Sequence, residues 1–257
     1  MKVQYFGDKH DFRKYLLLRQ LARQDFKIGV CWMLTRDDGR ADGNMRAYLD
    51  EGAASEWRHF DEKLYDLLAS EVSVRTLTEK QLKSPTCEQF LSIERRGLIE
   101  GGIYFNDYLT LHPKHEIIDN SRLYFERAAE AFSSSNPDLI FFDPDNGFSE
   151  TCSITSGRAA KYLYFQEAKK FYDTGKSLVV YQHSPFVPRD KFVPDITRRL
   201  SDHLGGCTVK AFETPNVLFL VAVYPGHEPR LQNVEGVVGS EWPKKKNLVW
   251  ISERPTT

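Results

Sequence analysis

The residues best suited to chemistry lie in Asp143-Pro144-Asp145-Asn146-Gly147, directly after the short apolar run 139–142. Such a run is typical of a buried parallel strand, and ligands of open α/β sheets bind just outside the carboxyl ends of strands. A carboxylate beside an apolar pocket can act as a general base or stabilise a developing cation. We therefore expect 143–148 to form the floor of an active site, with Asp143 and Asp145 as its catalytic residues.

Two neighbouring side chains in the same turn are suited to holding a nucleobase. The amide of Asn146 combines a donor with an acceptor, which matches the edge of a base. The ring of Phe148 can stack on a base. The alternative is structural, because Asp and Asn often build the turn that follows a strand.

A second polar turn, His183-Ser184-Pro185, follows the apolar run 177–181. Neighbouring parallel strands would place it close to the first turn. His183 could polarise a carbonyl or protonate a leaving group, and Ser184 could hold a phosphate. The alternative is a histidine that only caps the edge of the sheet.

Basic residues with interleaved aromatic residues follow this second turn. Arg189, Lys191 and Arg198 lie within one predicted loop and helix, and Lys245 lies in a run of three lysines in the tail. Such a mixture can contact phosphates and stack on bases, so we predict contacts with a nucleic-acid backbone here. Solvated basic residues with no partner are the alternative.

The elements that must position these turns alternate between helices and strands. Apolar periodicity predicts helices over 11–24, 55–70, 87–93, 120–132, 156–173 and 195–204, and strands over 27–34, 139–142, 177–181, 207–212 and 217–224. Weaker patterns suggest strands at 72–77 and 101–105. This order predicts an α/β protein: a single three-layer domain with a mostly parallel sheet and a C-terminal antiparallel hairpin.

Two finer expectations concern the ends of the chain. In the first helix, the periodicity places five polar residues mostly opposite the apolar side: Arg13, Lys14, Gln20, Arg23 and Gln24. The segment 225–257 reads as a loop-rich tail that packs back on the domain, so residues 1–257 form one catalytic domain without an evident internal boundary.

Composition narrows the possible partners. The chain has 257 residues and a formal net charge of -1, so any nucleic-acid contact must come from a local basic patch. It contains no apolar run of the roughly 18 residues needed for a membrane span. The four cysteines are scattered without a metal-type pair. We expect a soluble cytoplasmic protein without a membrane partner or a metal site; the sequence does not determine the oligomeric state.

Asp143-Pro144-Asp145-Asn146 resembles the Asp-Pro-Pro-Tyr motif of Rossmann-like adenine-N6 methyltransferases, and is closest to small ribosomal-RNA adenine methyltransferases. The order is also similar, with 7–11 opening a helix before the first strand and a hairpin at the end. This resemblance implies S-adenosylmethionine as cofactor. This sequence departs from the pattern of that family at two places. The charged loop 35–40 stands where the family has a glycine-rich cofactor loop, and Asn146 stands where it has a stacking tyrosine.

Asp143-Pro144 and His183-Ser184-Pro185 also resemble, in kind and order, two active-site phrases of uracil-DNA-glycosylase-type enzymes. This resemblance implies chemistry without a cofactor on a nucleotide flipped out of its strand. Asn146 would read the base, and Asp143 or Asp145 would support the cationic sugar and aim a water. His183 would stabilise the departing base. We add Asp8, before the first helix, and Trp32, in the first strand, as base-binding residues.

The leading hypothesis is a DNA glycosylase that acts on a modified base, with bacterial defence against phages as an associated setting. The first alternative is an S-adenosylmethionine-dependent DNA or RNA base methyltransferase. The second is an inactive nucleic-acid-binding or protein-interaction module on the same scaffold.

Overall fold

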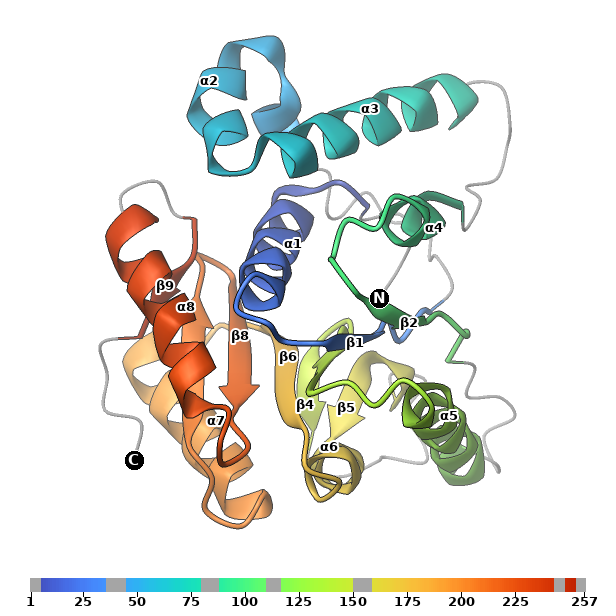
Figure 1. Cartoon of the computed structure of the whole chain (residues 1–257), viewed down its shortest axis with the longest axis vertical. Helices are drawn as coiled ribbons and strands as arrows, with labels where there is room; N and C mark the ends of the chain where they lie inside the picture. Colours follow the sequence, from blue (N-terminus) through green and yellow to red (C-terminus); the bar gives the residue numbers. More distant parts are fainter. Residues whose placement is uncertain are drawn as a thin grey trace.

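A seven-stranded sheet forms the centre of the molecule, in the order β2-β1-β3-β6-β8-β7-β9 (Figure 1). The computed structural model describes residues 6–35, 45–79, 88–109, 117–149, 159–242 and 248–252. The strands of this sheet are β1 (Ile28–Cys31), β2 (Ile103–Phe105), β3 (Leu139–Phe142), β6 (Ser177–His183), β7 (Val209–Glu213), β8 (Val217–Ala222) and β9 (Trp250–Ile251). A separate parallel pair is formed by β4 (Gly147–Ser149) and β5 (Tyr162–Tyr164).

The strand directions confirm the predicted α/β class. β2, β1, β3 and β6 pair in parallel, whereas β8 pairs antiparallel with both β6 and β7, and β9 pairs antiparallel with β7. The predicted C-terminal hairpin is therefore present, and its second strand, β8, is an internal strand between β6 and β7. All six residues of β8 are buried, which fits a strand covered on both faces.

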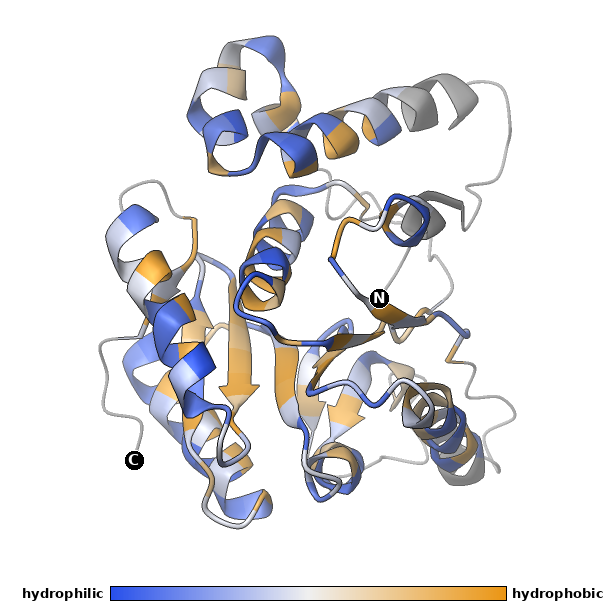
Figure 2. Cartoon of the chain, in the orientation of Figure 1, coloured by the Kyte–Doolittle hydropathy of each residue, from blue (hydrophilic) through white to orange (hydrophobic). Residues whose placement is uncertain are grey.

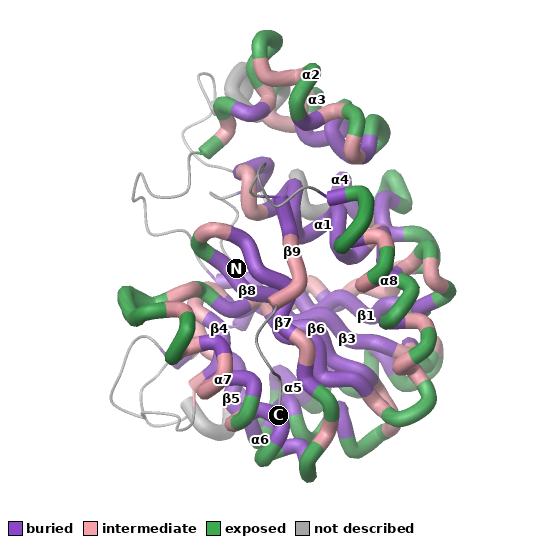
Figure 3. Tube along the Cα trace, turned by 90° about the vertical axis from the view of Figure 1, so that its left-hand side faces the viewer, coloured by how far each residue is buried: buried purple, intermediate pink, exposed green. Residues whose placement is uncertain are grey.

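Helices cover both faces of the sheet and give the three predicted layers. The described helices are α1 (Lys9–Ala22), α2 (Ala54–Trp57), α3 (Glu62–Glu79), α4 (Glu88–Arg95), α5 (Ile117–Ser133), α6 (Phe165–Tyr172), α7 (Arg189–His203) and α8 (Glu228–Glu241), with 3-10 turns at Ala47–Leu49, Glu51–Ala53, Arg58–Phe60 and Ala159–Lys161. Of these, α2 and α3 lie outside α1 and not on the sheet itself (Figure 1). Successive residues of β3 alternate between two apolar cores, one under α1, α3 and α8 and one under α5, α6 and α7. Figure 2 shows the apolar strands, and Figure 3 shows their burial.

Some predicted elements differ from the observed ones. Residues 72–77, a suggested strand, belong to α3, and the predicted helix over 156–173 includes β5 before α6 begins. The described part of the tail contains α8, whose Leu231, Val234 and Val238 recur at helical spacing and are buried. That spacing was present in the sequence, so the description of the tail as loop-rich was wrong.

The helix α1 is enclosed on several sides, which the periodicity did not reveal. In Figure 1 it lies between the sheet and the α2–α3 segment, and it also contacts α8. Phe12 packs against the rings of Tyr48, Trp57 and Tyr65 from that segment. Ten of the fourteen residues of α1 are buried as a result. The expectation of a polar side was wrong for Arg13, Lys14 and Gln20, which are all buried, whereas Arg23 and Gln24 are not buried.

A helix that crosses a bilayer must be both long and strongly apolar. No helix in the described part of the chain combines the two.

Candidate functional site

The predicted turn after β3 lies at the carboxyl ends of the parallel strands. The amide of Asp143 donates to the carbonyl of Cys31 at 3.1 Å, which extends the pairing of β3 with β1. The hydroxyl of Thr35, beyond the end of β1, donates to Oδ2 of Asp145 at 3.1 Å. The ends of β1 and β3 are thus joined through Asp145. This is the edge at which open α/β sheets bind ligands.

Gly147 allows the turn to approach β6. Its φ is +109°, and a Cβ at this position would lie 2.3 Å from Oε1 of Gln182. The same oxygen accepts from the amide of Phe148 at 2.8 Å, while Nε2 of Gln182 donates to the carbonyl of Asn146 at 3.1 Å. The amide of His183 donates to the same carbonyl at 3.1 Å. The two predicted polar turns therefore lie side by side.

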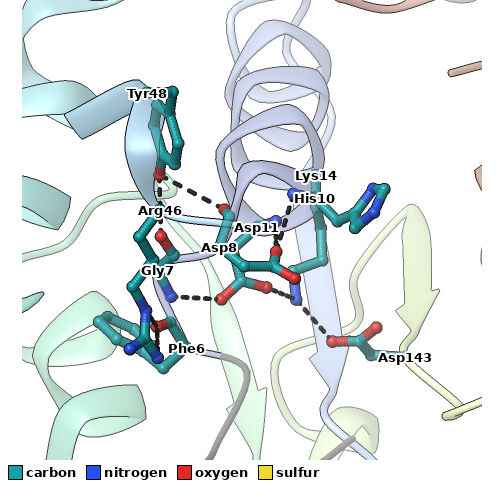
Figure 4. A network of polar contacts seen from close by, with 9 residues as sticks. All are labelled: Phe6, Gly7, Asp8, His10, Asp11, Lys14, Arg46, Tyr48 and Asp143. Carbon is teal, nitrogen blue, oxygen red and sulfur yellow. Dashed lines mark hydrogen bonds and ion pairs between the residues drawn. The ribbon is translucent and has the colours of Figure 1, made fainter. Parts of the chain in front are cut away.

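A buried lysine on α1 connects that helix to the turn (Figure 4). Nζ of Lys14 lies 2.7 Å from Oδ1 of Asp11 and 2.8 Å from Oδ2 of Asp143, and all three side chains are at most 5% exposed. Burial alone would lower the pKa of Lys14, but the charges of Asp11 and Asp143 outweigh burial and raise it. Lys14 therefore remains an ammonium group that holds the carboxylate of Asp143 in place.

A third carboxylate, Asp8, caps α1 beside this ion pair. Its Oδ1 accepts from the amides of His10 and Asp11 at 2.7 and 2.9 Å, which satisfies two orphan donors of the helix. Burial raises the pKa of Asp8 to about 8, and the charge of Asp11 adds to the shift. Asp8 therefore takes up a proton at a pH near neutrality.

Three polar groups beside these carboxylates retain hydrogen-bonding capacity. Among the described residues, the side-chain amide of Asn146 and Nε2 of His183 have no hydrogen-bond partner, and Nδ1 of His10 is buried without one. Burial lowers the pKa of His10 to about 4, and the nearby charges of Arg13 and His183 lower it further. The exposed imidazole of His183 and the half-buried amide of Asn146 therefore carry hydrogen-bonding groups that no described residue uses, whereas Nδ1 of His10 is enclosed.

Two predicted base-stacking residues are packed in the interior. Trp32 is fully buried, donates from Nε1 to Glu94 at 3.1 Å and stacks on Tyr104 with ring centroids 6.1 Å apart. Phe148 is 8% exposed and stacks on Phe165 at 4.7 Å. Both rings already have aromatic neighbours, so neither offers an open face for a base. Asp8, the other predicted base-binding residue, acts as the helix cap.

The predicted basic residues are mostly engaged with acids. Arg189 lies 3.0 Å from Oε2 of Glu213, and Arg198 lies 2.9 Å from Asp195 and 3.1 Å from Asp202. Lys191 is exposed, and the amide of Ser184 donates to the carbonyl of Asn216.

Lys245, the fifth predicted backbone contact, lies outside the described residues. Around α7, two of the three predicted basic residues, Arg189 and Arg198, are therefore paired with neighbouring acids.

The sequence interpretation missed His10, Asp11 and Lys14. A usable signal existed, since Asp11 and Lys14 are three residues apart and share one face of a helix. The partner of Lys14 at Asp143 is 129 residues away, so no local pattern could reveal it.

A scan against protein-family models finds no match for this chain, and a search of curated proteins finds no relative. Within the described ranges, no group of three or more His, Cys, Asp or Glu side chains is arranged to hold a metal ion.

The geometry assigns different capacities to the two catalytic candidates. Asp143 is 2% exposed and its carboxylate is held by Lys14, so it is suited to positioning the turn. Asp145 is half-buried, lies next to Asn146, and is joined through the turn to His183. A carboxylate, an amide and an imidazole arranged in this way can hold a polar ligand and move a proton.

Proposed function

We propose that this protein is a nucleobase-processing enzyme that binds one nucleotide flipped out of its strand and hydrolyses its N-glycosidic bond. The observation that carries the proposal is the proximity of Asp145, Asn146 and His183 at one edge of the sheet, two of which have unused hydrogen-bonding groups. These are the groups needed to aim a water, read a base edge and stabilise a departing base.

The roles differ from those expected for the two carboxylates. Asp145 is the residue that supports the cationic sugar and aims the water. Asp143 is a positioning residue, because its carboxylate is already paired with Lys14 at 2.8 Å. Asn146 holds the base through its side-chain amide, and His183 donates or shares a proton with the leaving base through Nε2.

The test is base excision on duplex DNA that carries either ordinary or modified bases, followed by alkaline cleavage of abasic sites. Strand breaks that require the protein, and that are lost in Asp145→Asn, support the proposal. Asp138→Asn is the matched control, because Asp138 lies at the opposite end of the same strand and should leave excision unchanged. Absence of strand breaks on every DNA tested would overturn the glycosylase assignment.

A second candidate is methylation of a base with S-adenosylmethionine. The observation that favours it is the sheet topology: parallel strands β1, β3 and β6 are followed by a hairpin whose second strand, β8, lies between β6 and β7. A terminal hairpin of this kind is part of the resemblance to Rossmann-like adenine-N6 methyltransferases. Methyl transfer to an exocyclic amine also needs hydrogen-bond acceptors at the turn more than it needs a strong base.

Calorimetry separates the two candidates. Micromolar binding of S-adenosylmethionine, together with transfer of a labelled methyl group to nucleic acid, would replace hydrolysis by methylation. Absence of such binding, with excision observed, would exclude the methyltransferase candidate.

A further inference from the structure

An open groove between α5 and α6 lies outside the candidate site, on the other helical layer. It encloses about 340 Å³, which lies within the range of small-molecule sites in proteins. Its floor is formed by Phe125 and Phe132 of α5, Phe171 of α6 and Ile140 of β3, all of them nearly or completely buried. The groove is therefore apolar at its base, where four largely buried side chains line it.

The rim of this groove has an uneven charge. Lys170 and Lys176 both line it, and Glu126 is the acidic residue on the rim. Glu126 is paired with Arg122 at 2.8 Å, so its charge is compensated on its own helix. Lys170 forms no ion pair with another described residue, and Lys176 donates to the neutral side chain of Asn136 at 2.6 Å. Two ammonium groups therefore line the groove beside its apolar floor; the carboxylate of Glu167 interacts with Lys170, and that of Asp138 interacts with Lys176.

The ammonium group of Lys176 is partly removed from water. Burial lowers the pKa of Lys176, and the carboxylate of Asp138, which opposes this shift, is itself paired with Arg230 at 2.9 Å. An anionic ligand group beside Lys176 would relieve the cost of its partial desolvation.

We propose that this groove binds a small amphipathic anion, with an aliphatic or aromatic body on the phenylalanine floor and a carboxylate between Lys170 and Lys176. The apolar floor supplies affinity through burial of hydrocarbon, and the two ammonium groups select the sign of the head group. The volume suits a medium-chain carboxylate and excludes a folded protein segment. The proposal does not depend on the function of the site at the end of β3.

Isothermal titration of the full chain with octanoate tests the proposal, with octylammonium and octanol as probes of the same apolar length. Octanoate should bind saturably. Octylammonium should bind at least about tenfold more weakly, because the two lysines attract a carboxylate and repel an ammonium group. Lys170→Gln combined with Lys176→Gln should weaken octanoate about tenfold and leave octanol unchanged. Equal affinity for the two ionic probes would overturn the assignment of an anion.

A matched pair of substitutions locates the binding. Ala129→Trp places a large ring in the groove and should abolish octanoate binding, whereas Ala131→Trp on the exposed surface of the same helix should preserve it. Thermal melts establish that both variants fold. No binding of octanoate to the unmodified chain, or binding that survives Ala129→Trp in a folded protein, would overturn the proposal.

Discussion

The two ends of the parallel strands differ in how their polar groups are satisfied. At the amino-terminal end, Oγ of Ser177 lies 2.9 Å from Nδ1 of His227 and accepts from the amide of Tyr224 at 2.9 Å. Arg230 donates to Asp138 at 2.9 Å and to the carbonyl of Asp25 at 2.9 Å. These contacts fasten the start of α8 to the sheet.

The carboxyl-terminal end is built differently. Asp11 and Asp143 both contact the ammonium group of Lys14, and Asp8 lies beside them with a raised pKa; the amide of Asn146 and Nε2 of His183 have no partner among the described residues. Saturated polar groups stabilise the native state, whereas buried carboxylates in excess of their counter-charges reduce its stability. The difference between the two ends thus separates a structural site from a candidate functional one.

The largest effect is expected from removal of the buried ammonium group. Lys14→Met leaves Asp11 and Asp143 buried without a counter-charge, and should lower the free energy of unfolding by about 3–5 kcal/mol. Urea denaturation measures this change. Arg58→Met is the control, because Arg58 pairs with the exposed Asp66 and its replacement should have a much smaller effect. Similar losses in the two variants would show that the buried network is unimportant.

The two ends of β3 should respond oppositely to loss of a carboxylate. Asp145→Asn should lower base excision by at least about 100-fold, since general acid–base catalysis contributes that much. Its free energy of unfolding should stay within about 0.5 kcal/mol of the parent. Asp138→Asn should weaken its ion pair with Arg230 and leave the excision rate unchanged. Full excision activity in Asp145→Asn would remove Asp145 from the mechanism.

The free energy of unfolding should depend on pH through the buried carboxyl group of Asp8. The pKa of Asp8 is about 8 in the folded protein against 3.8 when unperturbed, so the folded state binds the proton more tightly. Its contribution is therefore most favourable below pH 3.8 and is lost as the pH rises through 8. Asp8→Asn keeps a good N-cap. It should raise the free energy of unfolding at pH 9 by at least about 1 kcal/mol and leave it unchanged at pH 3.5.

Urea denaturation at the two pH values measures this effect. Asp66→Asn serves as the exposed control, because the hydrogen bond from Arg58 lowers the pKa of Asp66 and the pH dependence has the opposite sign. Stabilisation by Asp8→Asn that is equal at both pH values would contradict the assigned protonation.

The smallest effect is expected at the saturated end. Ser177→Ala removes the hydrogen bonds with His227 and Tyr224, and should lower the free energy of unfolding by about 1 kcal/mol. Base excision should not change, because these groups lie at the opposite end of β6 from His183. A loss of activity in a fully folded Ser177→Ala protein would end the distinction between the two ends of the sheet.

Much of the fold could be predicted because its signals are local. Continuous apolar runs identified β3, β6 and β8, and the polar residues that follow β3 and β6 marked the edge where the two turns meet. The alternating order of helices and strands was sufficient for the α/β class. The segment 72–77 was misassigned because its apolar residues also fit the end of a long helix, α3.

The sequence by itself determined the turn Asp143–Gly147, since proline and a glycine with positive φ specify it locally. The tertiary structure alone decided which carboxylate of this turn is paired with the buried lysine. Enclosure of α1 by the sheet, α3 and α8 buries a lysine that periodicity placed outward, and that lysine then requires a counter-charge. Asp143 supplies it from 129 residues away, whereas Asp145 in the same turn accepts from the hydroxyl of Thr35.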